Sequence, residues 1–170
     1  MPRALELCLV LMTLPLWGAA ILLIALVLAF DRPIFFRQAR PGLYGRPFTL
    51  IKFRTMRPGP EADAERLTRL GRFLRATSLD ELPELLNVLR GEMALVGPRP
   101  LLMAYLAEYT PAEHHRHDVR PGITGWAQVH GRNAITRADK VRYDLDYIAR
   151  RSTAFDFYIL FLTIFHLRGN

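Results

Sequence analysis

The amino-acid sequence predicts an α+β protein that is mainly helical, with an apolar N-terminal helix in a membrane and a compact domain on the membrane surface. Three observations lead to this class. Residues 7–30 carry no charge at all. Elsewhere, leucines recur at the helical spacings of three and four, and the strand-like runs are short. Glycine and proline clusters separate these segments, so we expect the β structure to be limited to short hairpin elements.

The composition fits one compact domain with a terminal anchor. The chain has 170 residues, a formal net charge of +7 and 51% hydrophobic residues, which excludes a disordered chain. Its single cysteine, Cys8, excludes an intrachain disulfide and a zinc site built from cysteines. The positive charge indicates an anionic partner: nucleic acid, anionic lipid or a phosphorylated substrate. Most of that charge is arginine, which suits phosphate binding but can equally reflect the base composition of the coding DNA.

The uncharged run is too long for a signal peptide and long enough to cross a bilayer. Pro15 and Gly18 interrupt it. A kinked spanning helix is one interpretation, and it is the one that the run favours by itself. The other is a helix that breaks and leaves the membrane by the face it entered. The flank that follows is basic and is expected to face cytoplasmic, anionic headgroups through Arg32, Arg37, Arg40, Arg46, Arg54 and Arg57. We expect a membrane segment over residues 1–31 and a catalytic domain over 32–170.

The remaining elements follow in order. Residues 48–53 have the pattern of a strand, after the turn-forming residues 40–47. Leucine spacing predicts helices over 62–75, 79–90 (ended by Gly91), 101–109 and around 141–148. Residues 94–96 are expected to be extended, and 120–129 to mix turns and strand. Residues 155–167 are too few to span a membrane, so they form either a core helix or a helix lying in the membrane plane.

The most informative polar segment opens the second predicted helix, Thr77-Ser78-Leu79-Asp80-Glu81-Leu82-Pro83-Glu84. The spacing of Ser78 and Glu81 is that of a capping box, and Pro83 favours Asp80 as the N-cap of a helix that begins late. The spacing by itself favours this structural role. The location also suits chemistry, because a helix N-terminus stabilises phosphoryl groups. Two neighbouring carboxylates can then divide the roles of nucleophile and ligand to Mg²⁺.

Other polar residues allow two interpretations each. Arg99, between Pro98 and Pro100, is either a solvated residue of a rigid turn or a preorganised phosphate ligand. Lys52, inside a predicted strand, either extends to water at a sheet edge or contacts phosphate. The loop that begins at Arg120 is either a turn with a packed tryptophan or part of a site. Three histidines near Asp118 have a spacing that fits no usual metal site.

Five ordered motifs carry a resemblance over nearly the whole chain. The sequence resembles the bacterial sugar transferases, the monotopic phosphoglycosyl transferases, in their small form. The motifs are Phe35-Phe36-Arg37-Gln38-Ala39-Arg40-Pro41-Gly42, Lys52-Phe53-Arg54-Thr55-Met56, Leu79-Asp80-Glu81-Leu82-Pro83, Val96-Gly97-Pro98-Arg99-Pro100 and Arg120-Pro121-Gly122-Ile123-Thr124-Gly125-Trp126-Ala127-Gln128-Val129.

The resemblance implies an activity. Such enzymes move a phospho-sugar from a UDP-sugar to polyprenyl phosphate, usually undecaprenyl phosphate, and release UMP with the help of Mg²⁺. It implies that Asp80 is the nucleophile that forms a covalent phospho-sugar, that Glu81 coordinates Mg²⁺ and that Arg99 contacts phosphate. It further implies less defined polar roles in the active-site region for Lys52, Arg75, Arg120, Arg132 and Asp156.

The resemblance also bears on the membrane segment. In this family the N-terminal helix is re-entrant and broken at a Ser-Pro pair, which implies that the helix here is re-entrant and broken at Pro15. It also implies a catalytic domain on the cytoplasmic face of the bacterial inner membrane. This chain departs in two places: Thr13-Leu14-Pro15 shifts the hydroxyl by one residue, and Arg137 stands where the family often has tryptophan.

Two other function classes fit the residues less well. A membrane-tethered nucleic-acid or polyanion binder needs a basic stripe with interleaved aromatics, whereas the basic residues here are separated by Gly/Pro loops. A glycoside hydrolase needs two carboxylates on opposite sides of a sugar ring, which the adjacent residues Asp80 and Glu81 can hardly provide. We therefore expect no nucleic-acid partner. The sugar and the oligomeric state stay open.

Overall fold

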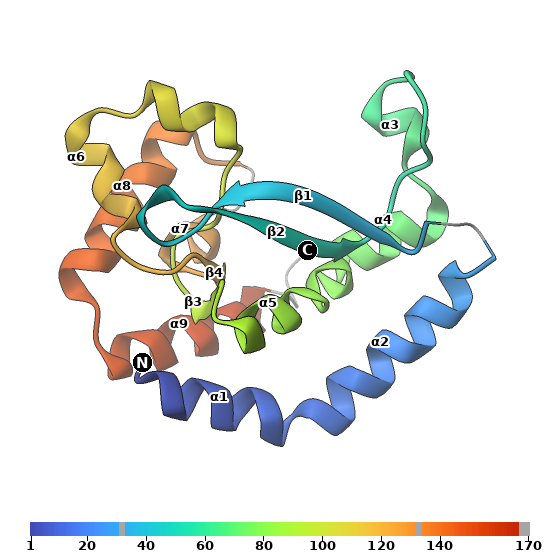
Figure 1. The fold of residues 1–170 in the computed structure, drawn as a ribbon, viewed down its shortest axis with the longest axis horizontal. Helices are drawn as coiled ribbons and strands as arrows, with labels where there is room; N and C mark the ends of the chain where they lie inside the picture. Colours follow the sequence, from blue (N-terminus) through green and yellow to red (C-terminus); the bar gives the residue numbers. More distant parts are fainter. Residues whose placement is uncertain (31–32, 132–133, 167–170) are drawn as a thin grey trace.

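The computed structural model describes residues 1–30, 33–131 and 134–166. Over these residues the protein is mostly helical and contains two small sheets, so the predicted mainly helical α+β class is confirmed. A long hairpin crosses the middle of the molecule (Figure 1). Helices α1 and α2 run along one edge, and the C-terminal helices gather at one end of the hairpin.

The hairpin consists of β1 (Phe35–Pro41) and β2 (Pro47–Phe53), joined by a short 3₁₀ turn, η1 (Leu43–Gly45). The predicted strand over 48–53 is confirmed, whereas β1 was not predicted. The antiparallel register pairs Phe36 with Lys52 and Arg40 with Phe48. Because side chains alternate between the faces of a strand, these four residues lie on one face of the hairpin.

The expectation that the β structure is limited to short hairpin elements is wrong, because a second sheet pairs β3 (Ala94–Val96) with β4 (Gly122–Thr124) in parallel. This confirms the extended segment over 94–96 and the mixture of strand and turn over 120–129, which also contains α7 (Trp126–Val129). The backbone at the start of β4 approaches the residue that follows β3 very closely. A Cβ atom on Gly122 would lie 2.1 Å from the backbone nitrogen of Gly97, so a glycine is required there. The pairing fixes where the loop after β3 begins.

The predicted helix over 62–75 is wrong as a single element. It is divided into α3 (Asp63–Arg66) and α4 (Arg69–Ala76). The chain between them is extended, because the backbone nitrogen of Thr68 donates to the carbonyl of Thr55 and its hydroxyl caps α4 by accepting from Gly71 at 2.8 Å. A Cβ on Gly71 would lie 2.0 Å from the Thr55 carbonyl oxygen, so α4 crosses this backbone at a glycine.

The predicted helix over 79–90 also has two parts, a 3₁₀ turn η2 (Leu79–Glu81) and α5 (Glu84–Arg90). Gly91 ends α5 in the left-handed conformation, as predicted. Asn87 of α5 is fully buried and ties this helix to the hairpin. Its side-chain amide donates to the carbonyl of Thr49 at 2.8 Å and accepts from the backbone nitrogen of Ile51 at 3.2 Å.

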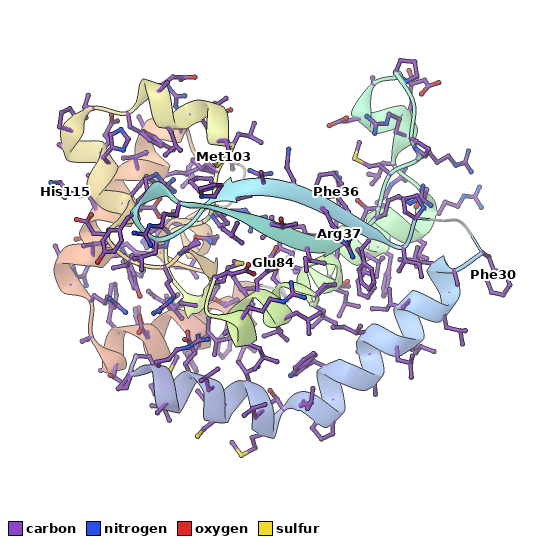
Figure 2. All side chains as sticks on the ribbon, in the orientation of Figure 1. Phe30, Phe36, Arg37, Glu84, Met103 and His115 are labelled. Carbon is purple, nitrogen blue, oxygen red and sulfur yellow. The ribbon has the colours of Figure 1, made fainter. Side chains whose placement is uncertain are left out.

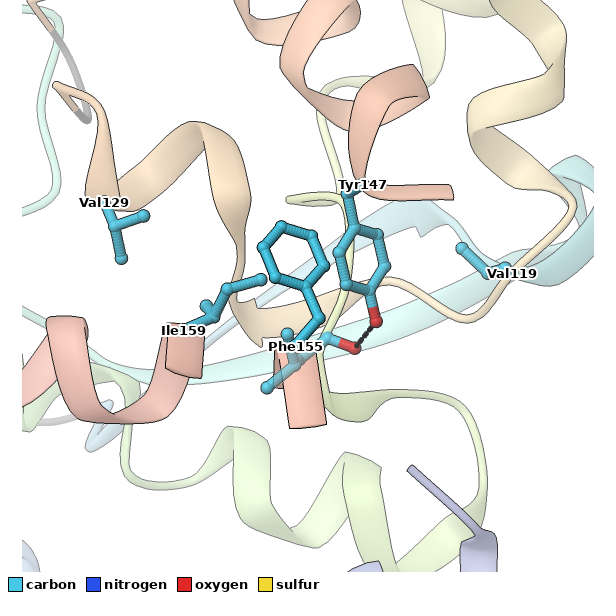
Figure 3. Packing of buried hydrophobic residues seen from close by; sticks show 6 residues of the cluster. Val119, Val129, Tyr147, Phe155 and Ile159 are labelled. Atoms are coloured by element: carbon cyan, nitrogen blue, oxygen red, sulfur yellow. Dashed lines mark hydrogen bonds between the residues drawn. The ribbon is translucent and has the colours of Figure 1, made fainter. Parts of the chain in front are cut away.

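The C-terminal third is built from helical segments. The predicted helix over 101–109 is a 3₁₀ segment, η3 (Met103–Glu108), whereas the helix expected around 141–148 is present as α8. The other segments are α6 (Pro111–His114), η4 (His115–His117), α8 (Arg137–Arg150) and α9 (Thr153–His166). Helices α8 and α9 share a core around Tyr147, Phe155 and Ile159 (Figure 3). The Tyr147 hydroxyl donates to the carbonyl of Val96, which joins this core to β3.

Helix α9 accounts for most of the predicted segment over 155–167, whose last residue lies outside the described part. One side of α9 belongs to the core. The other side is apolar and exposed through Phe157, Tyr158, Phe161, Ile164 and Phe165. The core side confirms the interpretation as a core helix, and the interpretation as a helix lying in the membrane plane stays a prediction.

The apolar N-terminal segment forms two helices, α1 (Arg3–Met12) and α2 (Leu14–Leu28), with a bend of 59° between them. Within the described residues, no individual helix has the length and apolar character to cross a membrane, although this bent pair has them when taken together. Many of their large apolar side chains are exposed, and Phe30 projects beyond α2, away from the rest of the molecule (Figure 2).

Local hydrogen bonds explain the break between α1 and α2. Pro15 has no backbone N–H and cannot continue the α1 ladder. The Thr13 hydroxyl donates back to the carbonyls of Leu9 and Val10 at 2.8 and 3.2 Å, and the indole nitrogen of Trp17 donates to the same Val10 carbonyl at 2.9 Å. The shifted hydroxyl of Thr13-Leu14-Pro15 thus closes the end of α1, and a tryptophan from α2 reinforces it.

Helix α1 packs on the body of the protein. Val10 and Trp17 belong to a core cluster with Leu50, Val88 and Met93. The polar residues at the start of α1 make long-range contacts as well. The Arg3 guanidinium donates to the backbone carbonyl of Val88 on α5 and to that of Met93, and the Glu6 carboxylate accepts from the backbone nitrogen of Leu95 at 2.6 Å.

Candidate active site

A cavity of about 980 Å³ opens between the hairpin, the η2 turn and the β3–β4 pair. Its wall contains the five predicted site residues Lys52, Arg75, Asp80, Glu81 and Arg99. They come from β2, α4, η2 and the loop after β3, so segments far apart in sequence converge here. Apolar side chains line another part of the wall, among them Leu82, Leu85, Leu95, Ile123 and Leu160.

The η2 turn presents Asp80 and Glu81 without the predicted cap. Ser78 has a left-handed backbone (φ 57°), and its side chain makes no capping hydrogen bond, so the predicted capping box is wrong. Asp80 makes no capping hydrogen bond to α5 either, because the N-cap position of that helix is Pro83. The helix-capping role that the sequence spacing favoured for Asp80 and Glu81 is therefore wrong. A non-glycine residue in the left-handed region is also uncommon and often occurs at functional sites.

Glu81 is the centre of an ion-pair network. Its Oε1 accepts from Lys52 Nζ at 2.7 Å and from Arg99 Nη2 at 2.5 Å. Burial alone would raise the pKa of Glu81, but the two cations outweigh burial and lower the pKa below its ordinary value. Glu81 also raises the pKa of Arg99. The network therefore fixes one ionised carboxylate between two cations.

Asp80 differs from its neighbour. Its side chain is buried, with 8% of the residue exposed, and burial together with repulsion from Glu81 raises the pKa of its carboxyl. The positive charges of Lys52, Arg75 and Arg99 act against this shift. Arg75 reaches the cavity from α4, where its Nε donates to the Thr55 hydroxyl at 2.9 Å. Asp80 is thus a buried carboxyl group surrounded by three positively charged side chains.

Glu84, which the sequence analysis did not select, belongs to the same network. It is buried, and its Oε1 lies 3.1 Å from Lys52 Nζ. Burial, assisted by repulsion from Glu81, raises the pKa of this carboxyl despite the lysine. A signal for it existed: Glu84 follows Glu81 by three residues at the start of a predicted helix, which is the spacing of neighbours on a helix surface. Figure 2 shows Glu84 on α5, beneath the hairpin.

The loop that carries Arg99 is anchored by a second residue missed in the sequence. Arg116 is 1% exposed, and its Nη2 donates to the Arg99 carbonyl at 2.9 Å and to Asp144 Oδ2 at 2.6 Å. Its Nη1 donates to the Tyr109 hydroxyl at 3.2 Å. No sequence pattern distinguished Arg116 from the histidines around it. The buried pair of Arg116 and Asp144 therefore holds the backbone of the Arg99 loop in place.

Two predicted site residues, Arg120 and Asp156, lie elsewhere. Neither of them belongs to the cavity wall that the described residues form. The Nε of Arg120 donates to the Gly91 carbonyl at 2.8 Å, and the buried Asp156 accepts from the Tyr147 hydroxyl at 2.7 Å and from the amino group of Met1. Arg132 lies outside the described residues. The structure therefore brings together five of the eight predicted polar residues.

The donor set is compatible with Mg²⁺. No cluster of three or more His, Cys, Asp or Glu side chains suited to a metal occurs in the described part of the chain. Mg²⁺ commonly uses one or two carboxylates and takes its remaining ligands from water and substrate phosphates. Asp80 and Glu81, adjacent in one cavity with Lys52 and Arg99, fit that kind of site.

Comparison with known proteins decides the family. The sequence model described as bacterial sugar transferase matches residues 1–169. The chain belongs to the bacterial sugar transferase family. The resemblance inferred from the five motifs is therefore confirmed. In this sugar transferase, the matched region includes the whole cavity described above.

Several relatives of this sugar transferase are known by name. It is 52% identical over 143 residues to "Uncharacterized sugar transferase EpsL" of Bacillus subtilis, with 81% of this chain and 71% of that protein covered. It is 44% and 41% identical to two proteins named UDP-glucose:undecaprenyl-phosphate glucose-1-phosphate transferase, from Xanthomonas campestris and Escherichia coli. These matches cover 81% and 84% of this chain, which spans about a third of the length of those two relatives.

Proposed function

We propose that this sugar transferase moves a sugar-1-phosphate from a UDP-sugar to a polyprenyl phosphate, undecaprenyl phosphate by the names of its relatives, and releases UMP. One observation carries the proposal: a buried carboxylate, Asp80, lies in a cavity that also presents Lys52, Arg75 and Arg99. Two anionic substrates require such a positive cavity, because phosphoryl transfer depends mainly on positioning and charge neutralisation. The names of the Xanthomonas and Escherichia relatives support the same substrates.

The chemistry has two steps. In the first, an oxygen of the Asp80 carboxylate attacks the phosphorus that bears the sugar, the bond from this phosphorus to the bridging oxygen breaks, and UMP leaves with that oxygen. In the second, a phosphate oxygen of the lipid acceptor attacks the same phosphorus, which releases Asp80 as a carboxylate and forms the lipid diphosphate sugar. A covalent intermediate of this kind gives ping-pong kinetics.

The neighbouring residues have distinct tasks in this proposal. Lys52 and Arg99 donate to Glu81 Oε1 at 2.7 and 2.5 Å, and these two bonds keep the Glu81 carboxylate ionised and in one position. Glu81 would hold Mg²⁺, which when bound neutralises charge on the substrate phosphates. The positive charges of Lys52, Arg75 and Arg99 favour the ionised form of Asp80, the form that can attack phosphorus.

Glu81→Gln is expected to weaken the response to Mg²⁺. The amide keeps the size of the side chain but loses the negative charge, so we expect the Mg²⁺ concentration for half-maximal activity to rise by at least about tenfold. Titration of the initial rate with Mg²⁺ measures it. Glu65→Gln, at an exposed position, is the matched control and should titrate like the natural protein. An unaltered metal dependence of Glu81→Gln would count against this ligand.

We further propose that residues 1–31 form a re-entrant membrane segment and that residues 32–170 form a catalytic domain on the cytoplasmic face of the bacterial inner membrane. The 59° bend at Pro15, the exposed apolar side chains of α1 and α2, and the contacts of Arg3 and Glu6 with the body support it. A helix that crossed the membrane would carry Arg3 to the opposite side. The exposed apolar side of α9 provides a second contact with lipid, and the exposed Arg37 and Arg46 face anionic headgroups, whereas Arg40 lines the cavity.

Cysteine labelling tests the topology. In a Cys8→Ala background, Ala4→Cys at the start of α1 and Ala138→Cys on α8 both occupy exposed positions. A re-entrant segment places both on the same side, so a membrane-impermeant maleimide should label both in inverted vesicles and neither in intact spheroplasts. Labelling of Ala4→Cys in spheroplasts alone would show instead that the segment spans the membrane.

The decisive experiment on the activity is a UMP-release assay in nanodiscs. The full chain is incubated with undecaprenyl phosphate, Mg²⁺ and a panel of UDP-sugars. UMP release that depends on the lipid phosphate supports the proposal, and the panel identifies the sugar. Release of UDP would indicate ordinary glycosyl transfer, and sugar release without any lipid acceptor would indicate hydrolysis. Either result would overturn the proposed reaction.

A further inference from the structure

Arg40 presents a guanidinium to the cavity from β1, on the face of the hairpin that carries Lys52. Its Nη1 donates to the Pro100 carbonyl at 3.2 Å and its Nη2 donates to Gln38 Oε1 at 2.6 Å. The Nε is buried and has no hydrogen-bond partner among the described residues. A buried donor of a charged group without an acceptor is costly, so the guanidinium lacks part of the compensation that a bound anion would supply.

The charges around Arg40 also favour a bound anion. Its two acceptors are neutral, whereas two other cations of the site have carboxylate partners: Lys52 contacts Glu81 and Glu84, and Arg99 contacts Glu81. Burial and the positive charge of Arg99 lower the pKa of Arg40, and Glu84 compensates this only in part. Arg40 is therefore a cation whose charge is incompletely balanced within the protein.

Arg40 and Arg99 are attached to the same short loop. Arg99 belongs to it, and Arg40 donates to the carbonyl of the next residue, Pro100. The bonds to Pro100 and Gln38 hold the guanidinium plane in one orientation before any ligand arrives, which reduces the entropy lost on binding. Guanidinium groups in a fixed orientation are well suited to phosphate, whose oxygens accept two parallel hydrogen bonds.

We propose that Arg40 is a phosphate-binding residue of this cavity, with its guanidinium donating to a phosphate oxygen beside Arg99. The phosphate is either that of the sugar nucleotide or that of the lipid acceptor, since both enter the same cavity in the proposed reaction. The inference rests on the proposed function for the source of the phosphate. The binding itself does not require that transfer takes place.

The test compares Arg40→Gln, Arg40→Lys and Arg142→Gln with the natural chain in nanodiscs. Arg142 is 70% exposed on α8, so its replacement removes the same charge away from the cavity. UDP binding is measured by titration calorimetry, and the KM for undecaprenyl phosphate is measured in the UMP-release assay. Loss of a charge-assisted hydrogen bond predicts that one of these two constants rises by about tenfold or more in Arg40→Gln.

The two arms separate the sources of phosphate. A weaker affinity for UDP assigns Arg40 to the sugar nucleotide, and a higher KM for undecaprenyl phosphate with unchanged UDP binding assigns it to the acceptor. Arg142→Gln should change neither constant. If Arg40→Gln matches Arg142→Gln in both constants, Arg40 does not bind phosphate and the inference is overturned.

Arg40→Lys keeps the inference testable if the glutamine variant does not fold. Lysine retains the charge but lacks the planar fork and the Nε–H donor. We expect it to lose part of the affinity, and a folded lysine variant with both constants unchanged would overturn the inference. If the natural chain transfers no sugar phosphate but Arg40→Gln still weakens UDP binding, the proposed reaction fails and the phosphate site stands.

Discussion

Asp80→Asn is expected to abolish both the covalent phospho-sugar adduct and turnover. Asparagine has nearly the same shape as aspartate, but its amide oxygen is a poor nucleophile towards phosphorus, so the first step has no attacking group. Loss of a catalytic nucleophile reduces kcat by about four orders of magnitude or more. Intact-protein mass spectrometry after incubation with the UDP-sugar measures the adduct, and UMP release measures turnover.

The control for this variant is Asp63→Asn. Asp63 also lines the cavity, but its side chain is 82% exposed at the rim. The same chemical change at the rim should leave the adduct and the rate near those of the natural chain. An adduct of undiminished yield in Asp80→Asn would remove Asp80 as the nucleophile, and a loss of equal size in both variants would indicate a general effect of cavity charge.

Arg116→Met is expected to produce the largest loss of stability. The substitution leaves Asp144, which is 1% exposed, without its cation in the protein interior. Breaking a buried ion pair in this way costs about 3–5 kcal/mol. For a chain of this size, such a loss lowers the thermal midpoint by about 10 °C. Differential scanning fluorimetry in detergent measures the shift.

The pH dependence of this loss has a definite sign. Even beside Arg116, burial raises the pKa of Asp144 to about 6, and its pKa is about 3.9 in an unfolded chain. Without Arg116 the folded-state pKa rises further, so the folded protein holds a proton that the unfolded chain releases. The stability loss should therefore be larger at pH 8 than at pH 5. Arg116→Met combined with Asp144→Leu removes both charges and should recover much of the stability. A pH-independent loss would argue against an uncompensated carboxylate.

The parts of the site that the sequence predicted are those where the chemistry is local. Asp80 and Glu81 are adjacent, and Arg99 lies between two prolines, so each belongs to a short motif that can be recognised without the fold. Spacing alone favoured a capping role for the acidic pair, and the resemblance carried by the motifs assigned all three residues to the site. The apolar run before the hairpin was equally clear, because its length and lack of charge are properties of one segment. The break at Pro15 follows from a missing backbone donor.

The parts that could not be predicted depend on long-range contacts. The helix over 62–75 divides because the backbone of Thr55, more than ten positions earlier, pairs with Thr68. The capping box fails because Ser78 adopts a left-handed backbone, which no spacing rule anticipates. Arg116 depends on Asp144, which lies 28 positions further along the chain.

Arg40 is an intermediate case. Residues 35–41 show no strict alternation of apolar and polar residues, and only the antiparallel register with β2 places Phe36, Gln38 and Arg40 on the face of Lys52. The run was predicted in part as turn because of the proline and glycine that follow it. Recognition of β1 and of its register would have added Arg40 to the candidate site.

The contacts of Arg3 have a mechanical consequence. Arg3 of α1 holds the carbonyl of Val88 near the end of α5, and the first turn of α5 carries Glu84 against Lys52. Helix α5 has seven residues and is therefore only about 10 Å long. If α1 lies in the bilayer as proposed, a change in bilayer thickness or tension would change the tilt of α1. Because Arg3 is bonded to α5, this tilt would shift α5 and with it the contact between Glu84 and Lys52. Lipid composition would then change the reaction rate through the position of α5, in addition to its effect on how the lipid substrate dissolves in the membrane.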